Sequence, residues 1–281
     1  MSAHTEHSDR FVTVRGLRFH YCEWGDTAAP AAVFLHGITS DARAWDDEAR
    51  ALAARFRVVA LDLRGHGDSE KAPDGDYSHQ TLADDFAAVA DAIGLARFHL
   101  VGLSLGGRVG FAYAAAHPGR VERLVVVDIG PDIAADGILR VLRAMASAPE
   151  RFATLDDVRA WIRAMNPRYT ETKLRQRAEL AVRPLPDGGY GWKYDVELRE
   201  SVRQGRMRPA PDLWPAWTAL ACPTLLIQGA ESDLLTDEIA KRMIEAQPHA
   251  RLAVVPGAGH TVPGDQPAAF LRLLTEFLTA P

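Results

Sequence analysis

A serine between two glycines is the residue best placed for chemistry in this chain. It lies in the segment Gly102-Leu103-Ser104-Leu105-Gly106, which has the pattern G-x-S-x-G. The apolar residues 98–101 predict a strand before it, and the small residues 107–116 predict a helix after it. A sharp strand-to-helix turn exposes a serine hydroxyl, and flanking glycines avoid collisions with nearby backbone. The segment therefore predicts Ser104 as a nucleophile.

A serine nucleophile needs a base that accepts its proton and a carboxylate that orients the base. His260 is the candidate base, because it follows an apolar run ending at Val255 in a loop that contains glycines. Asp233 is the candidate acid, in the loop after the apolar run that ends at Ile227. Asp128, at the end of an earlier apolar run, is the alternative acid. It could instead simply accept backbone N–H bonds at that strand end.

Acyl transfer also needs two N–H groups directed at the developing oxyanion. The backbone N–H of Leu105, directly after the serine, is one candidate. The N–H of Ile38, after the early segment Phe34-Leu35-His36-Gly37, is the other. We expect His36 itself, like His66, to be a turn residue that hydrogen-bonds backbone rather than a catalytic group.

Composition excludes several other kinds of protein. The 281 residues carry a net charge of −5, which gives no sign of nucleic-acid binding. No apolar run is long enough to span a membrane. Neither metal-ligand spacing nor a phosphate-binding loop occurs, so we expect no metal and no cofactor. Two distant cysteines, Cys22 and Cys222, predict reduced, buried thiols in a cytoplasmic protein.

Short apolar runs alternate with helical patterns along most of the chain. Such runs are typical of parallel strands that are buried on both faces, so we expect an α/β fold with helices on both sides of a mostly parallel sheet. An alternating pattern around Arg15-Gly16 predicts an N-terminal hairpin. The expected strands are 11–14, 17–21, 31–35, 58–61, 98–101, 124–127, 225–227 and 252–255, and the expected helices outside the insertion are 47–55, 82–93, 107–116, 236–246 and 270–278.

The alternation stops between residues 131 and 215. This segment has helical pieces at 137–145, 155–165 and 171–180 and no convincing buried strand. We interpret it as a helical cap inserted into a core formed by residues 1–130 and 216–281. The cap holds 15 Lys and Arg against 12 Asp and Glu, so it carries +3 in a chain of net charge −5. The tryptophans in or near the cap are expected to lie mainly in its core.

These motifs together resemble the α/β-hydrolase superfamily over nearly the whole chain. The His36-Gly37 turn, the loop 62–69, the turn at Ser104, the loop of Asp233 and Gly259-His260 follow in the order of that family. The resemblance implies a serine hydrolase with a helical cap, of esterase or enol-lactonase type. A serine at the turn disfavours the aspartate-nucleophile chemistry of the epoxide hydrolase and haloalkane dehalogenase relatives.

The expected function is therefore hydrolysis of a small-molecule carboxylic ester through Ser104, His260 and Asp233. An enol-lactonase or C–C bond hydrolase would use the same residues, and an amidase shares the chemistry. A non-catalytic binding protein is disfavoured, because such a protein is expected to have lost one of the three groups. The expected partner is a small ester or lactone, with no nucleic acid or membrane, and the chain is expected to act as a monomer or homodimer.

Overall fold

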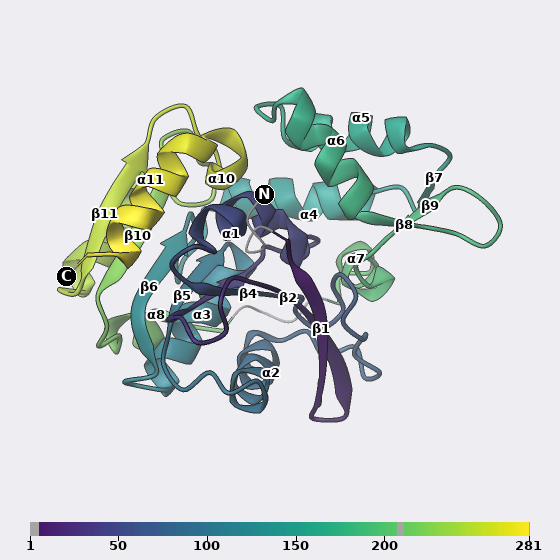
Figure 1. Ribbon diagram of the computed structural model, residues 1–281. Helices are drawn as coiled ribbons and strands as arrows, with labels where there is room; N and C mark the ends of the chain where they lie inside the picture. The colour runs from purple at the N-terminus through teal and green to yellow at the C-terminus, as the bar shows by residue number, and fades with distance from the viewer. Residues whose placement is uncertain (1–5, 207–210, 281) are drawn as a thin grey trace.

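The computed structural model describes residues 6–206 and 211–280. An eight-stranded sheet crosses the molecule in the order β1-β2-β4-β3-β5-β6-β10-β11 (Figure 1). Its strands are β1 (Ser8–Val14), β2 (Leu17–Trp24), β3 (Ala31–Leu35), β4 (Arg57–Leu61), β5 (Phe98–Leu103), β6 (Val121–Val127), β10 (Thr224–Gly229) and β11 (Ala250–Val255). The N-terminal hairpin β1–β2 is antiparallel, as is the β2–β4 pair. The remaining pairs are parallel, which confirms the expected mostly parallel sheet.

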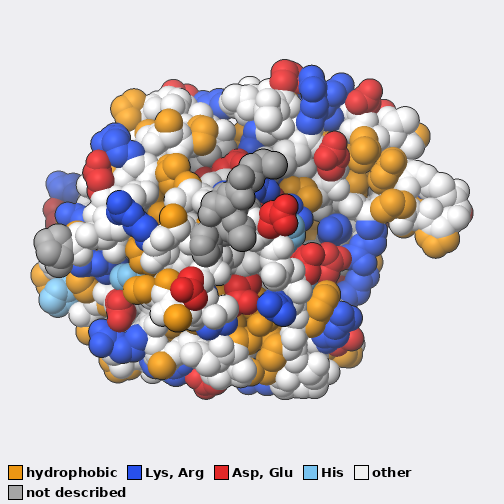
Figure 2. Space-filling model, viewed as in Figure 1, with side chains coloured by type: hydrophobic (Ala, Val, Ile, Leu, Met, Phe, Trp, Pro, Cys, Tyr) orange, Lys and Arg blue, Asp and Glu red, His pale blue; other side chains and the backbone are white. Residues whose placement is uncertain are grey.

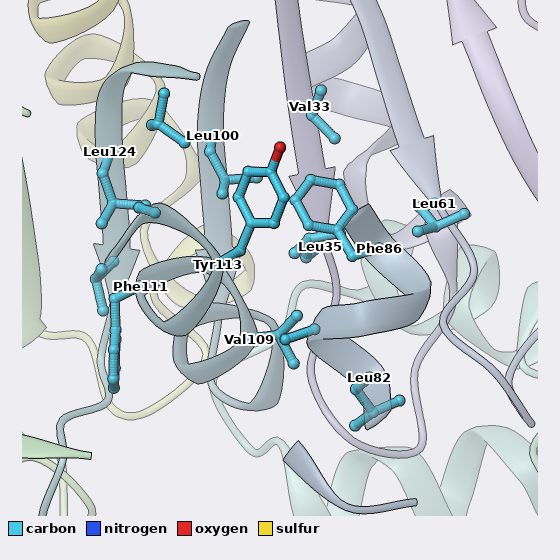
Figure 3. Close-up of a cluster of buried hydrophobic side chains, with 14 of the residues drawn as sticks. Val33, Leu35, Leu61, Leu82, Phe86, Leu100, Val109, Phe111, Tyr113 and Leu124 are labelled. Atoms are coloured by element: carbon cyan, nitrogen blue, oxygen red, sulfur yellow. The ribbon is translucent and has the colours of Figure 1, made fainter. Parts of the chain in front are cut away.

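Helices cover both faces of this sheet. They are η1 (Ala42–Trp45), α1 (Asp46–Leu52), α2 (His79–Ala92), α3 (Leu105–Ala116), α8 (Trp214–Thr218), α9 (Asp237–Ala246), α10 (Val262–Asp265) and α11 (Pro267–Leu278). Side chains of α2, α3, α8 and α9 pack on one face of the strands, part of which Figure 3 shows. Side chains of α1 and α11 pack on the other face. Successive strand residues such as Val33 and Phe34 therefore point to opposite faces and belong to different cores, which explains the continuous apolar runs.

The chain between β6 and α8 forms a separate group of elements at one side of the sheet (Figure 1). It contains α4 (Ala135–Ser147), α5 (Leu155–Met165), α6 (Glu171–Leu180) and α7 (Val196–Arg203), with a core of its own. We call the described residues 131–206 and 211–215 the cap. The boundaries at 131 and 215 stay a prediction, and residues 207–210 lie outside the described part.

The cap also contains short strands, which the interpretation as a helical insertion did not include. Three short strands, β7 (Arg151–Phe152), β8 (Val182–Pro184) and β9 (Tyr190–Trp192), form an antiparallel sheet in the order β7-β9-β8. Strands of two or three residues carry too little periodicity for a sequence pattern to reveal them. The turn between β8 and β9 uses positive φ angles at Gly188 and Gly189.

On the face of the molecule in Figure 2, charged side chains of both signs lie among scattered hydrophobic ones. No helix within residues 6–206 and 211–280 is long and apolar enough to cross a membrane. Both cysteines are free thiols, but only Cys22 is buried; Cys222 is half-buried, which corrects the expectation for that residue.

Candidate active site

Ser104 lies at the corner between β5 and α3, where the sequence predicts it. Its backbone has φ 55° and ψ −118°, a left-handed conformation that is strained for a residue with a side chain. The Ser104 N–H donates to the Val127 carbonyl at 3.1 Å, which ties the corner to the neighbouring strand β6. The corner is thus held in a sharp turn.

The two glycines beside the serine allow this turn by close backbone approach. A Cβ at Gly102 would lie 2.3 Å from the Gly106 carbonyl oxygen. A Cβ at Gly106 would lie 2.3 Å from the Leu35 carbonyl oxygen on β3. Both distances are far inside van der Waals contact, so the G-x-S-x-G spacing is a packing requirement of this turn.

His260 follows β11 and hydrogen-bonds Asp128. Its Nδ1 lies 2.9 Å from Asp128 Oδ2, and because a carboxylate only accepts, Nδ1 carries the proton. Asp128 is completely buried, and His260 is 16% exposed. The bond fixes the ring orientation and leaves Nε2 as the nitrogen able to accept a proton.

Three donors converge on the Asp128 carboxylate. The Gly229 N–H donates to Oδ1 at 2.8 Å. The Ser232 hydroxyl lies 2.5 Å from Oδ2, which also accepts the His260 bond. These three bonds fix the orientation of the buried carboxylate. Asp128 thus does accept backbone N–H bonds, as its alternative interpretation expected, and it orients His260 as well.

The structure does not place Asp233 against His260, which corrects the sequence prediction for the acid. Its carboxylate instead binds the Arg140 guanidinium of α4 through two bonds, Nε to Oδ2 at 2.5 Å and Nη2 to Oδ1 at 2.7 Å. This bidentate bond with Arg140 lowers the pKa of Asp233 below its usual value. The pair is about half exposed, at 48% for Arg140 and 42% for Asp233. Asp233 therefore connects the core to the cap.

The backbone N–H groups of Leu105 and Ile38 remain the candidate donors to an oxyanion. Leu105 is the first residue of α3, so its N–H has no acceptor inside the helix. Within the described residues, neither N–H donates to a protein group. Ile38 and Ser104 line the same cavity.

His36 and the Ser40 N–H, which donates to the Gly37 carbonyl at 3.2 Å, together hold the peptide between Gly37 and Ile38. The His36 Nε2 accepts the Leu63 N–H at 3.1 Å, so Nδ1 is the protonated nitrogen and donates to the Gly37 carbonyl at 2.8 Å. In a trans peptide the C=O and N–H groups point in opposite directions. Holding the Gly37 carbonyl inward therefore turns the Ile38 N–H away from His36.

Both buried turn histidines are neutral. Burial lowers the pKa of His36 to about 3 and that of His66 to about 4. His66 Nδ1 lies 2.9 Å from the Arg64 carbonyl oxygen. The expectation that these histidines hydrogen-bond backbone is confirmed.

A cavity of about 550 Å³ lies between the cap and the end of the sheet that carries Ser104 and His260. Apolar cap side chains form part of its wall, including Val141, Met145, Trp161 and Trp192. Trp217, in contrast, is completely buried in the main core. The cavity is large enough for a small organic substrate.

Four cations of the cap also line this cavity, and each one pairs with a carboxylate of the core. The pairs are Arg140 with Asp233, Arg168 with Glu231, Lys173 with Asp47 and Arg177 with Asp41. The last pair is buried and bidentate. The positive charge of the cap thus serves in part to attach it to the acidic core around the cavity.

Two other groups of side chains could offer metal ligands among the described residues. They are His7, Asp9 and Cys22, and His20, Asp62 and Asp68. In the second group His20 Nδ1 already bonds Asp62 at 2.7 Å, and Asp62 accepts the backbone N–H groups of Ala42 and Asp68. Through these bonds, the buried Asp62 carboxylate links β2 to the loop after β4, which is a structural role.

Comparison with known proteins agrees with this geometry. Residues 30–267 match the family model of the alpha/beta hydrolase fold. A 3-hydroxybutyrate-oligomer hydrolase of Cupriavidus necator is 30% identical over 95% of both chains. An esterase of Mycobacterium tuberculosis is 30% identical over 89% of this chain and 83% of its own. The crystal structure of E-2-(acetamidomethylene)succinate hydrolase superposes with a TM-score of 0.90 at 29% identity, over 98% of this chain and all of that one.

The chain belongs to the α/β-hydrolase family. The family and the names of these relatives support a hydrolase.

Sequence reasoning missed the contributions of Ser232 and Arg168 to the surroundings of the site. A serine in a loop and an arginine in a basic cap carry no motif, so no sequence signal singles them out. Asp128 could be weighed only as an alternative, because the order of strands in the sheet decides which acid reaches His260.

Proposed function

We propose that this chain is a serine hydrolase that cleaves a carboxylic ester of a small molecule, with Ser104 as nucleophile, His260 as base and Asp128 as the acid. The observation that carries the proposal is the hydrogen bond between the buried Asp128 carboxylate and His260, which lines the same cavity as Ser104. Asp233 is not part of this assignment, because Arg140 occupies it.

The reaction follows from the positions of these groups. His260 Nε2 accepts the Ser104 proton as Oγ attacks the ester carbonyl carbon. The imidazolium then donates that proton to the leaving alkoxide as the C–O bond breaks, leaving an acyl-enzyme. Water, deprotonated by the same nitrogen, attacks the acyl carbon and releases the acid and the free serine.

The N–H groups of Ile38 and Leu105 stabilise the negative oxygen in both steps. A donor of this kind typically contributes about 3–4 kcal/mol to the transition state. Asp128 keeps the imidazole in the tautomer with Nε2 free and stabilises the imidazolium that forms. The chemistry needs only these groups of the chain and water.

The names of the relatives support the choice of substrates to test. One relative is named as an esterase, and another as a hydrolase of 2-(acetamidomethylene)succinate, a dicarboxylate that carries an amide. The apolar side chains in the cavity wall suit a small acyl group. Enol-lactones, C–C bonds next to a ketone and N-acyl groups remain alternatives for the same three residues.

The first experiment is labelling with a serine-directed fluorophosphonate. Wild type should be labelled, Ser104→Ala should not, and Ser147→Ala, which alters an exposed serine on α4, should behave as wild type. Equal labelling of wild type and Ser104→Ala would overturn the assignment. A panel of p-nitrophenyl esters, lactones and N-acyl compounds, each with and without a free carboxylate, then separates the alternatives.

A further inference from the structure

We propose that Ser232 is a positioning residue that holds Asp128 toward His260, and that α4 of the cap holds Ser232 in place through the residues next to it. This inference rests on the proposed function, because it concerns the acid of the same site. It assigns a role to the three consecutive residues Glu231, Ser232 and Asp233.

The hydrogen bonds around the Ser232 hydroxyl determine where its proton points. The N–H groups of Leu234 and Leu235 donate to its oxygen at 3.2 and 3.3 Å. A hydroxyl has one proton, and its lone pairs receive these two donors. The proton therefore points to Asp128 Oδ2, 2.5 Å away, where the carboxylate can only accept.

This bond is placed to control the orientation of the acid. Oδ2 is the same oxygen that accepts the His260 bond, and Oδ1 is held by the Gly229 N–H. Asp128 also has a positive φ of 52°, so its backbone is held in a conformation unusual for an aspartate at a strand end. Without the Ser232 donor, only one donor besides His260 would fix the carboxylate.

The residues on either side of Ser232 connect it to the cap. Glu231 binds Arg168, and Asp233 binds Arg140 on α4 through two bonds. Both arginines come from the cap and both line the cavity. The segment is therefore held by the cap one residue before and one residue after the hydroxyl.

Backbone contacts hold the start of α4 against the segment that contains Ser232. The Ala134 N–H donates to the Leu234 carbonyl at 3.0 Å. A Cβ at Gly137 would lie 2.1 Å from the Asp233 carbonyl oxygen, so only glycine lets α4 lie this close. The placement of the cap and the orientation of Asp128 are thus linked through three residues.

The central test is Ser232→Ala, assayed with the best ester found for the wild type. We expect kcat to fall about 10-fold, which corresponds to about 1.4 kcal/mol in the barrier, with KM within about 2-fold. Ser232→Thr keeps the hydroxyl and should retain most of kcat, and Ser147→Ala is the control. If Ser232→Ala does not fold in a thermal melt, Ser232→Cys, a weaker donor of similar size, replaces it with the same expectation.

A double-mutant cycle separates positioning from a general structural effect. If Ser232 acts through Asp128, Ser232→Ala should cost less than about 2-fold in fluorophosphonate labelling rate when Asp128 is already alanine. Gly137→Ala, which moves α4 off the segment, should lower kcat, and its combination with Ser232→Ala should lose less than the product of the two. Equal Ser232→Ala losses in both backgrounds, or an unchanged kcat, would overturn the role of Ser232; multiplicative losses with Gly137→Ala would overturn the cap link.

These results are distinguishable from a failure of the proposed function. Active, labelled Ser104→Ala or fully active Asp128→Asn would overturn the proposed function itself. Loss of activity in both, with a fully active Ser232→Ala, would overturn only this inference.

Discussion

Exchanging Asp128 for asparagine tests which carboxylate supports His260. Oδ2 of Asp128 receives the Ser232 hydroxyl and the His260 ring, and Oδ1 receives the Gly229 N–H. Asparagine has a single acceptor oxygen, so its NH₂ must face one of these donors. If the NH₂ takes the place of Oδ2, the imidazole must turn to the tautomer with Nε2 protonated, which cannot accept the serine proton.

The expected loss is large because Asp128 is completely buried. The same exchange in a Ser-His-Asp protease lowers kcat about 10⁴-fold, which corresponds to about 5.4 kcal/mol, and we expect a loss of that order for Asp128→Asn. Asp233→Asn is the matched control. It weakens a half-exposed ion pair with Arg140, which is typically worth about 0–1 kcal/mol, so kcat should change less than about 5-fold.

The assay is kcat on an activated ester, with the fluorophosphonate labelling rate as a second measure of nucleophile activation. A thermal melt of each variant establishes that the fold is intact. A larger loss for Asp233→Asn than for Asp128→Asn would refute the reasoning and return the acid to the loop after β10. A folded Asp128→Asn within about 10-fold of wild type would show that His260 needs no buried carboxylate.

Three further predictions concern the turn, the oxyanion donors and a buried acid. Gly106→Ala should lower the melting temperature and abolish labelling, since its Cβ would lie 2.3 Å from a β3 carbonyl oxygen, whereas Gly110→Ala on the same helix meets only ordinary contacts and should melt no lower than wild type. His36→Leu removes one of the two donors to the Gly37 carbonyl, leaving the Ser40 N–H, and should lower kcat about 10-fold with little change in KM; an unchanged kcat would contradict a role of His36 in orienting the Ile38 N–H. Burial raises the pKa of Glu48 from 4.5 to about 7, so the folded state binds this proton more tightly, and the stability it contributes below pH 4.5 is lost as pH rises through 7. The free energy of unfolding of Glu48→Gln in urea, minus that of wild type, should therefore rise by up to about 3 kcal/mol between pH 4.5 and pH 8. A difference that does not depend on pH would contradict this.

Much of the fold could be predicted from the sequence because its signals are local. The runs at residues 31–35 and 58–61 are buried on both faces, and they are strands β3 and β4. Helices α5 and α6 begin and end at the residues that the pattern predicts, since Thr154 and Thr170 cap them. The short cap strands could not be predicted, because pairing between distant residues rather than periodicity forms them.

The candidate site divides in the same way. Ser104 could be identified because the glycines around it are needed for a tight turn, and His260 because it follows an apolar run in a loop that contains glycines. Either aspartate satisfies the same local description, a carboxylate following a buried strand. Sequence alone therefore determined the candidate nucleophile and the candidate base, and it left the choice of candidate acid to the fold.

Only the tertiary structure decided between the two acids. In the sheet β6 lies between β5, which carries Ser104, and β10, so Asp128 emerges beside the serine and beneath the donors of the β10 loop. Asp233 lies at the contact with the cap, where Arg140, 93 positions earlier in the chain, binds it. Strand order and cap placement arise from packing among distant segments, and for that reason no local pattern of residues could specify which carboxylate reaches His260.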